Sequence, residues 1–421
     1  MTTPARTYQR ARNASTHHLI EELFDGRISR SDLVVEPVHC GGSDILRYTG
    51  EFWTSKQRQA SSLHEISYRA CFKAQLPRFF IDRITRTEEI VYDPFMGRGT
   101  TPLEAALLGR RAFGNDANPL SRIFTIPRLH LPSLDDVADR LGEVKIVSKA
   151  REAIDLSMFF HPRTKIEILS LRRYLTRRRE DRREDAVDRW IRMVATNRLT
   201  GHSKGFFSVY TLPPNQAMSQ ENQVKVNKQR RQKPDYRDVK ELILRKTKSL
   251  LRNVGEEQKL TLSQVSGKAK FLNGDARRTR SITSNSIKLT VTSPPFLDTV
   301  NYAADNWMRC WFNEFDIEAI ARNLTVVRSL DDWMETMGAV LRELYRITSP
   351  DGVVAFEVGE IRKRNLKLDE VVVPLGIGAG FTCAGILVNQ QDFTKTSNIW
   401  GIQNNRAGTN TNRIVVLQKP G

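Results

Sequence analysis

Two spacings of hydrophobic residues recur along the chain, one typical of buried strands and the other typical of helices. The strand-like runs are short, and several of them end at an acidic or turn-forming residue. Between them lie stretches in which apolar residues recur every three or four positions. Strands that alternate with helices predict an α/β fold with a mostly parallel sheet. The strand-like runs are residues 90–92, 271–272, 287–291, 353–356 and 414–417.

The segment 171–199 shows the helical spacing most clearly, although it is very rich in arginine. Acidic residues interleave with the arginines, which is typical of a solvated helix with ion pairs between residues four positions apart. The positions expected to be buried are Leu171, Leu175, Val187, Trp190, Ile191 and Val194.

The segment 88–121 reads EEIVYDPFMGRGTTPLEAALLGRRAFGNDANPLS. Its first strand ends at Asp93, and Gly97 and Gly99 permit a tight turn and a close backbone approach to a ligand. A helix and a second short strand follow, and that strand ends at Asp116. Such a unit is how α/β folds bind nucleosides, with the second acid placed to accept hydrogen bonds from ribose hydroxyls. A plain turn is the alternative for the glycines, since the loop is neither a GxGxxG fingerprint nor a Walker loop.

A second chemistry-bearing segment covers residues 268–303. Asp275 follows a short strand and could meet an adenine amino group. The alternating run 287–291 ends at Thr292-Ser293-Pro294-Pro295-Phe296, and two consecutive prolines cannot continue a sheet ladder. The loop therefore presents a hydroxyl, a carbonyl and an aromatic ring at the carboxyl edge of the sheet, where open α/β sheets carry their chemistry. A capping role for the serine and a core role for Phe296 are the alternatives.

Charge narrows the class of partner. The chain has 421 residues and a net charge of +18, with 66 Lys or Arg against 48 Asp or Glu. Residues 163–252 alone hold 24 Lys or Arg and 10 Asp or Glu. Such an excess favours a polyanion, most commonly nucleic acid, and phosphate contact is the better interpretation of this segment as a whole. Its candidate DNA-binding residues are Arg172, Arg173, Arg177, Arg178, Lys204, Lys225, Lys228, Arg230 and Arg231.

Other classes of protein are disfavoured by the residue pattern. Four cysteines form neither a metal pair nor a disulfide framework, and none has the Pro-Cys context that covalent C5-cytosine chemistry needs. The histidines form no metal-ligand pattern, so no metal is expected. No run approaches the ~20 apolar residues of a membrane span. The polar N-terminus has no apolar signal region, so we expect a cytoplasmic protein associated with the prokaryotic nucleoid.

Taken together, Asp93-Pro94-Phe95-x-Gly97-x-Gly99-Thr100, Asp116 and Thr292-Ser293-Pro294-Pro295-Phe296 resemble the motifs of the DNA amino-methyltransferases. The last loop resembles that of the cytosine-N4 group, which is typically Ser-Pro-Pro-Tyr, whereas the adenine-N6 group usually carries Asp or Asn first. The stretches 64–84 and 393–420 also resemble family members. The likeness covers roughly residues 52–121 and 268–419.

This resemblance implies a Rossmann-like class I methyltransferase domain with S-adenosylmethionine as cofactor. It implies that Ser293 and the Pro294 carbonyl accept hydrogen bonds from the target amine, and that Phe296 stacks on a base flipped out of the duplex. The implied catalytic residues are Ser293, Pro294, Pro295 and Phe296. The implied cofactor-binding residues are Lys73, Asp93, Pro94, Phe95, Gly97, Gly99, Thr100, Thr101, Asp116, Asn118 and Asp275.

The expected activity is therefore methylation of cytosine N4 in double-stranded DNA, for restriction-modification or host defence, with a cognate restriction endonuclease as a candidate partner. Adenine-N6 methylation is the first alternative. An RNA base methyltransferase and a catalytically silent DNA-binding protein are further alternatives. Two departures from the family bear on these choices: Phe296 replaces the usual tyrosine, and the long basic segment precedes the third strand rather than following it.

The expected organisation is one catalytic domain split by a mostly helical basic insertion. Residues 1–50 form a polar N-terminal extension, and residues 51–125 form the first, cofactor-binding part of the catalytic domain. Residues 126–266 form the insertion, the candidate DNA-recognition region, and residues 267–421 form the second part of the catalytic domain with the Ser-Pro-Pro-Phe loop.

Overall fold

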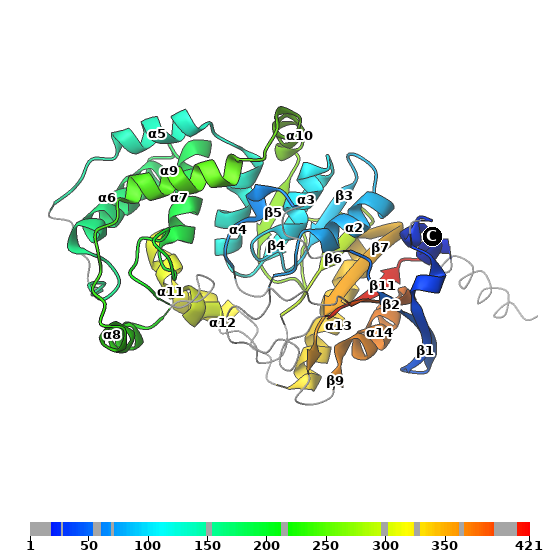
Figure 1. The fold of residues 1–421 in the computed structure, drawn as a ribbon. Coiled ribbons are helices and arrows are strands. Elements are labelled where there is room, and N and C mark those ends of the chain that lie inside the picture. The colour runs from blue at the N-terminus through cyan, green and yellow to red at the C-terminus, as the bar shows by residue number, and fades with distance from the viewer. Residues whose placement is uncertain are drawn as a thin grey trace, which may run out of the picture.

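The computed structural model describes residues 18–26, 28–53, 60–68, 71–148, 154–211, 218–295, 302–323, 329–361, 366–390 and 411–421. A nine-stranded sheet with helices on both faces occupies one side of the molecule, and a group of helices occupies the other (Figure 1). The α/β fold with a central sheet that the hydrophobic pattern predicts is therefore confirmed.

The strands of the large sheet lie in the order β1-β2-β10-β11-β7-β6-β3-β4-β5. The strands from β7 to β5 in this order are parallel, whereas β11 is antiparallel to both β7 and β10. A separate two-stranded sheet pairs β8 (Glu360–Ile361) with β9 (Leu366–Lys367). The bounds in the large sheet are β1 Val34–Cys40, β2 Ser43–Gly50, β3 Ile90–Asp93, β4 Arg111–Asp116, β5 Lys270–Asn273, β6 Ile287–Thr292, β7 Thr348–Val358, β10 Thr382–Gln390 and β11 Thr411–Gln418.

Alternating side chains of the central strands pack into two hydrophobic cores, one on each face of the sheet. Val353 and Ala355 belong to the core beneath α2 (Gln75–Ile84) and α3 (Thr100–Leu107). Their neighbours Val354 and Phe356 belong to the core beneath α13 (Leu330–Ile347) and α14 (Leu368–Gly378). Burial on both faces explains why β7 reads as a continuous apolar run.

The first 50 residues contribute to the sheet. The strands β1 and β2 pair as an antiparallel hairpin, and β2 then pairs in parallel with β10. The described part of this region therefore forms an edge of the large sheet, which differs from the separate polar extension expected for residues 1–50. Most residues of β1 are exposed, so the hydrophobic pattern of the sequence does not predict this strand.

A helical lobe is inserted between β4 and β5. It contains α5 (Leu134–Glu143), α6 (Pro162–Glu180), α7 (Ala186–Arg198), α8 (Gln220–Gln229) and α9 (Val239–Leu251), and α10 (Glu256–Ser266) returns to the sheet. Of the positions expected to be buried, Val187 is half-buried and the other five are buried.

Helix α11 (Tyr302–Asn313), which follows the Ser293 loop, packs on this lobe (Figure 1). Its Asn313 side chain donates to Thr196 Oγ1 on α7 at 2.9 Å, and Arg172 on α6 lies over the Trp311 ring at 4.8 Å. Two further α-helices are α4 (Leu120–Thr125) and α12 (Ile317–Asn323). Among the described helices, none is long and apolar enough to cross a membrane.

Candidate functional site

The carboxyl ends of parallel strands bring the predicted site residues to one edge of the sheet. Strand β3 ends at Asp93, β4 ends at Asp116, and Ser293 directly follows β6. The chain runs outward from β3 through β4 to β5 and then returns to β6 on the other side of β3. Ligands of open α/β sheets bind outside the carboxyl ends at such a reversal of strand order. The edge at β3 and β6 is therefore the candidate site.

The glycine loop between β3 and α3 adopts backbone angles that favour glycine. Gly97 has φ +49° and Gly99 has φ +76°, both in the left-handed region. A Cβ atom on Gly99 would lie 2.2 Å from Oγ1 of Thr125, so a side chain is also excluded by space. The close packing against Thr125 requires a glycine at position 99 in addition to the turn itself.

The Asp116 carboxylate is fixed by two backbone amides. Its Oδ2 accepts from the Gly97 amide and its Oδ1 from the Asn118 amide, both at 2.8 Å. Burial raises the pKa of this carboxyl above its usual range. Each oxygen retains a second lone pair that can accept from a ribose hydroxyl. The glycine loop and this half-buried acid fit the adenosine part of S-adenosylmethionine.

Asp93 joins the glycine loop to the Ser-Pro-Pro loop. Its Oδ1 accepts from the Thr292 hydroxyl at 2.6 Å and from the Phe95 amide at 3.0 Å, and the side chain is 1% exposed. Burial raises the pKa of Asp93 to about 7, although these hydrogen bonds act in the opposite direction. Through this buried carboxyl the two loops hold a fixed relative position.

Ser293 lies beside Glu357, a residue near the end of β7. In the same sheet Thr292 is the register partner of Phe356, so their successors are neighbours. The Asn412 side-chain amide donates to Glu357 Oε1 at 3.1 Å. Burial raises the pKa of the Glu357 carboxyl, and the polar groups of Ser293 and Asn412 act in the opposite direction.

The other predicted cofactor residues take different positions around the glycine loop. Asn118 is buried, and its Oδ1 accepts from the Leu120 amide at the start of α4. Lys73 is exposed just before α2, although partial desolvation of its ammonium group lowers its pKa. Asp275 is exposed and forms a bidentate ion pair with Arg277, so a ligand would have to compete with that guanidinium. Pro94, Phe95, Thr100 and Thr101 lie within or beside the loop, all at least half-buried.

The second half of the predicted catalytic loop is described only in part. Pro294 is buried, and Pro295 is exposed with its carbonyl accepting from the indole of Trp333 at 3.1 Å. Phe296 lies outside the described residues, as does most of the stretch 393–420 that resembles family members.

The predicted DNA-binding residues fall into two groups. Arg178 donates to Asp188 at 2.5 Å and to Asp185 at 3.3 Å, and Arg172 lies 3.7 Å from Glu314. These two arginines are therefore engaged within the lobe. The exposed members are Arg173, Arg177, Lys204, Lys225, Lys228, Arg230 and Arg231.

Three residues near the candidate site were not predicted from the sequence motifs. Glu357 is the one acid in the apolar run 353–358 of β7, and that contrast was the available signal. Tyr68 lies 3.4 Å from where a Cβ on Gly97 would be, and its hydroxyl accepts from Asn118 at 3.5 Å. Arg128 is fully buried and donates to the carbonyls of Leu63 and Arg98, which braces the glycine loop, and burial lowers its pKa to about 9. Nothing in local sequence marks Arg128, because its contacts are made by distant segments.

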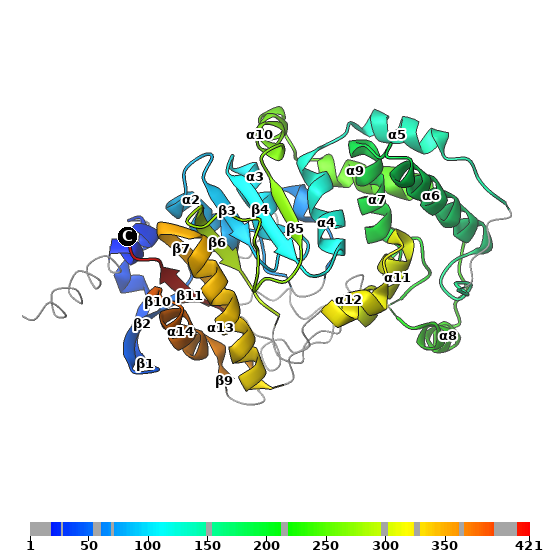
Figure 2. The same ribbon diagram turned by 180° about the vertical axis from the view of Figure 1, so that it is seen from behind.

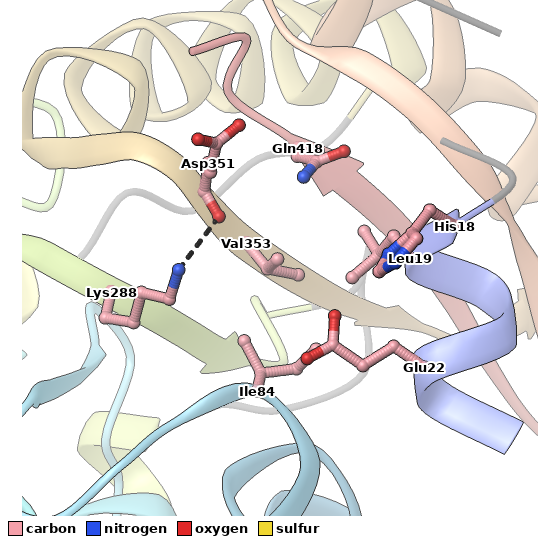
Figure 3. A pocket seen from close by; sticks show the side chains of 8 residues that line it. All are labelled: His18, Leu19, Glu22, Ile84, Lys288, Asp351, Val353 and Gln418. Carbon is pink, nitrogen blue, oxygen red and sulfur yellow. Dashed lines mark hydrogen bonds between the residues drawn. The ribbon is translucent and has the colours of Figure 1, made fainter. Parts of the chain in front are cut away.

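A cavity of about 410 Å³ lies at the opposite edge of the sheet (Figure 3). Lys288 at the start of β6 donates to the Asp351 carbonyl at 3.2 Å there, and Gln418 ends the antiparallel strand β11. This is the amino edge of the parallel strands, so the cavity is separate from the candidate site. The cavity is lined by His18, Leu19, Glu22, Ile84, Lys288, Asp351, Val353 and Gln418.

Within the described residues, no group of His, Cys, Asp or Glu could hold a metal ion.

Comparison with known families bears on the cofactor half of this site. Residues 28–121 match the model of the DNA methylase family. That family model covers both N6 and N4 enzymes, and the matched range holds the glycine loop, Asp93 and Asp116 but not Ser293. The match supports S-adenosylmethionine as cofactor and DNA methylation as the reaction class, and it does not separate the two bases.

Similar solved structures include methyltransferases of several kinds. A Thermus thermophilus protein assigned as a DNA modification methylase, in complex with S-adenosyl-L-methionine, is 22% identical (TM-score 0.23) over 35% of this chain and 52% of that one. The rRNA methyltransferase aviRa from Streptomyces viridochromogenes is 11% identical (TM-score 0.35) over 87% of this chain and 93% of that one. The first therefore aligns over about half of its own length. With TM-scores this low, neither adds to the assignment, and the comparison with curated proteins gives no match.

Proposed function

We propose that this chain transfers a methyl group from S-adenosylmethionine to the exocyclic N4 amine of cytosine in duplex DNA. One observation carries the proposal: Ser293, beside buried Glu357, directly follows the strand that Thr292 ties to Asp93 next to the glycine loop. The match of residues 28–121 to the DNA methylase family supports the same reaction class.

The pairing of Ser293 with Glu357 suits recognition of an amine. A serine hydroxyl has one proton to donate and two lone pairs that accept. In the proposed reaction Ser293 donates its hydroxyl proton to the ionised Glu357 carboxylate, which leaves the lone pairs of the hydroxyl to accept from an amino group. The Pro294 carbonyl is the second acceptor. Two acceptors on one amine favour the tetrahedral nitrogen whose lone pair is available for attack.

S-adenosylmethionine supplies an electrophilic methyl group bound to a positively charged sulfur. The glycine loop and Asp116 would hold its adenosine part, and Asp93 fixes their position relative to Ser293. The carbon–nitrogen bond forms as the carbon–sulfur bond breaks, and the amine then loses a proton. The Ser293 hydroxyl offers that proton a path to Glu357. Positioning of the two reactants supplies much of the acceleration.

Cytosine is the proposed base because a serine opens the Ser-Pro-Pro-Phe loop. The amine is paired within the duplex, so the base must leave the stack, and Phe296 is the proposed stacking partner. The biological setting that we propose is restriction-modification or host defence, with a cognate endonuclease as candidate partner.

Nucleoside mass spectrometry of plasmid DNA from cells that express the chain tests this function. N4-methylcytosine is expected with the wild type and should be absent with Ser293→Ala. N6-methyladenine in its place would contradict the choice of base while keeping the chemistry. If the DNA carried neither base, the proposed function would be wrong. Asp351→Asn, at the opposite edge of the sheet, serves as the matched control and should methylate like the wild type.

A further inference from the structure

The cations of the helical lobe differ in what they contact. On α6 and α7 several arginines have carboxylate partners: Arg178 with Asp188, Arg192 with Glu184, and Arg179 with Glu314 at 2.8 Å. These charges are neutralised within the fold. They hold helices together and leave less charge for a polyanion than the sequence suggests.

Helix α8 and the turn after it, residues 220–233, show the opposite arrangement. They hold five Lys or Arg and one acid, Glu221. Within the described structure, none of the five cations has a carboxylate within 4.0 Å. Arg230 instead lies over the Tyr210 ring, 3.8 Å from its centroid. Among the described residues, α8 and the turn after it therefore hold a run of cations that form no ion pair, whereas α6 and α7 hold both paired and unpaired ones.

The packing of α8 also differs from that of a core helix. Gln223 is its one fully buried residue, and its amide donates to the Tyr210 carbonyl at 3.0 Å. Asn227 donates to the Met158 carbonyl at 2.7 Å, and Gln220 donates to the Asp155 carbonyl. A polar helix held by side-chain amides leaves its outer face free. On that face Val224 is 52% exposed among polar neighbours.

The position of α8 relates it to the candidate site. The indole of Trp307 on α11 donates to the carbonyl of Met218, just before α8, at 3.1 Å. Helix α11 in turn follows the Ser293 loop. Figures 1 and 2 both show α8 at the outer end of the lobe, on the same side of the molecule as α11 and α12, and away from α10.

We propose that α8 is the helix that this chain places in the major groove of duplex DNA. The inference rests on the proposed function, in which DNA is the substrate. Lys225 and Lys228, with the arginines of the following turn, would contact phosphates. Asn222 offers a side chain that can pair with an adenine edge, and Val224 offers methyl groups for contact with thymine.

The first experiment measures affinity for DNA with purified full-length protein and a fluorescently labelled duplex of mixed sequence. Lys225→Ala/Lys228→Ala should weaken binding about tenfold and lower the salt slope by about two, since two phosphate contacts are lost. The matched control is Lys248→Ala/Lys259→Ala, which removes two exposed cations from α9 and α10. The control should bind within about twofold of the wild type, and circular dichroism should show that both variants fold.

Equal loss of affinity in the two double variants would overturn the inference, and so would a wild type that prefers single-stranded RNA to the duplex. A failure of the proposed function looks different. The duplex would then bind through α8 as described, but no methylated base would form. Binding therefore decides the role of α8 even if the reaction is not methylation.

The second experiment tests groove reading by mapping methylated positions in the DNA of cells that express each variant. Asn222→Ala or Val224→Ala should relax the preferred sequence at one or two base pairs, because each base contact is local. Glu256→Gln, at the start of α10, should leave the preferred sequence unchanged. An unaltered sequence preference in both α8 variants would contradict the groove assignment.

Discussion

Ser293 and Glu357 lie side by side at the carboxyl ends of two neighbouring parallel strands, at the edge of the sheet where the glycine loop also lies. The Asn412 amide donates to the Glu357 carboxylate from β11 at 3.1 Å. Asn412 thereby holds this buried carboxylate in place beside Ser293. In the proposed reaction the carboxylate would orient the Ser293 hydroxyl toward the amine.

Glu357→Gln should lower the methyl-transfer rate by roughly 10- to 100-fold, which corresponds to the loss of about 1–3 kcal/mol from a charge-assisted hydrogen bond. The KM for S-adenosylmethionine should stay nearly constant, because Glu357 contacts Ser293 rather than the glycine loop. Single-turnover rates with Glu256→Gln as control measure this effect. A rate equal to that of the wild type would show that Glu357 is only a packing residue.

The pH dependence of the same rate gives an independent check. Burial raises the pKa of Glu357 above its usual range, so the wild-type rate should rise with pH as this carboxyl ionises. Below that pKa the protonated acid can donate to Ser293 and occupy a lone pair that the amine needs. The Glu357→Gln variant should lack this rise, which is expected above pH 4.5, the ordinary pKa of a glutamic acid. If both proteins gave the same profile, another group would be responsible.

Asp93→Asn should change how stability depends on pH. The pKa of Asp93 is raised from 3.8 to about 7 in the fold, so the folded state binds more protons than the unfolded state between these values. The contribution of Asp93 is therefore fully present below about pH 4 and is lost as pH rises to about 7. The wild type should lose about 2–4 kcal/mol relative to the variant over this range. Urea unfolding at about pH 5 and about pH 8 measures the difference, and a constant difference would contradict it.

Asp116→Ala should weaken binding of S-adenosylmethionine by about 10- to 100-fold. The substitution removes the acceptor for ribose and releases the Gly97 and Asn118 amides that the carboxylate holds. We expect the free energy of binding to become less favourable by about 1–3 kcal/mol. Isothermal titration calorimetry measures the affinity, and Asp351→Asn is the matched control. Unchanged affinity in Asp116→Ala would show that the adenosine part of S-adenosylmethionine does not bind at this edge of the sheet.

Arg178→Ala should destabilise the lobe rather than only weaken DNA binding. Its guanidinium is 15% exposed, and it neutralises Asp188, whose side chain is fully buried, so we expect a loss of about 1–3 kcal/mol. Arg177→Ala, one position away and exposed, should change stability by less than about 0.5 kcal/mol. Thermal unfolding compares the two, and equal melting temperatures would contradict a structural role for Arg178.

The sequence predicted the two loops of the candidate site, because each loop is formed by residues close together in the chain. Asp93, Gly97 and Gly99 follow one strand, and the prolines after Ser293 mark the end of another, so strand ends and turns identified both loops. It failed to predict partners contributed from a distance. Arg128 and Glu357 act through contacts that only the folded sheet creates, and the partners of Arg178 depend on how α6 packs against α7.

Helix α11 links the helical lobe to the segment that carries the Ser293 loop. Asn313 and Trp311 anchor it to α7 and α6, although it lies in sequence within residues 267–421, the expected second part of the catalytic domain. A lobe exchanged between two related enzymes by cutting at residues 126 and 266 would arrive without this helix. Thr196 and Arg172, which contact α11 here, would then face the α11 of a different protein. New sequence specificities in such enzymes should therefore arise by change on α8, at the periphery, more readily than by wholesale transplantation.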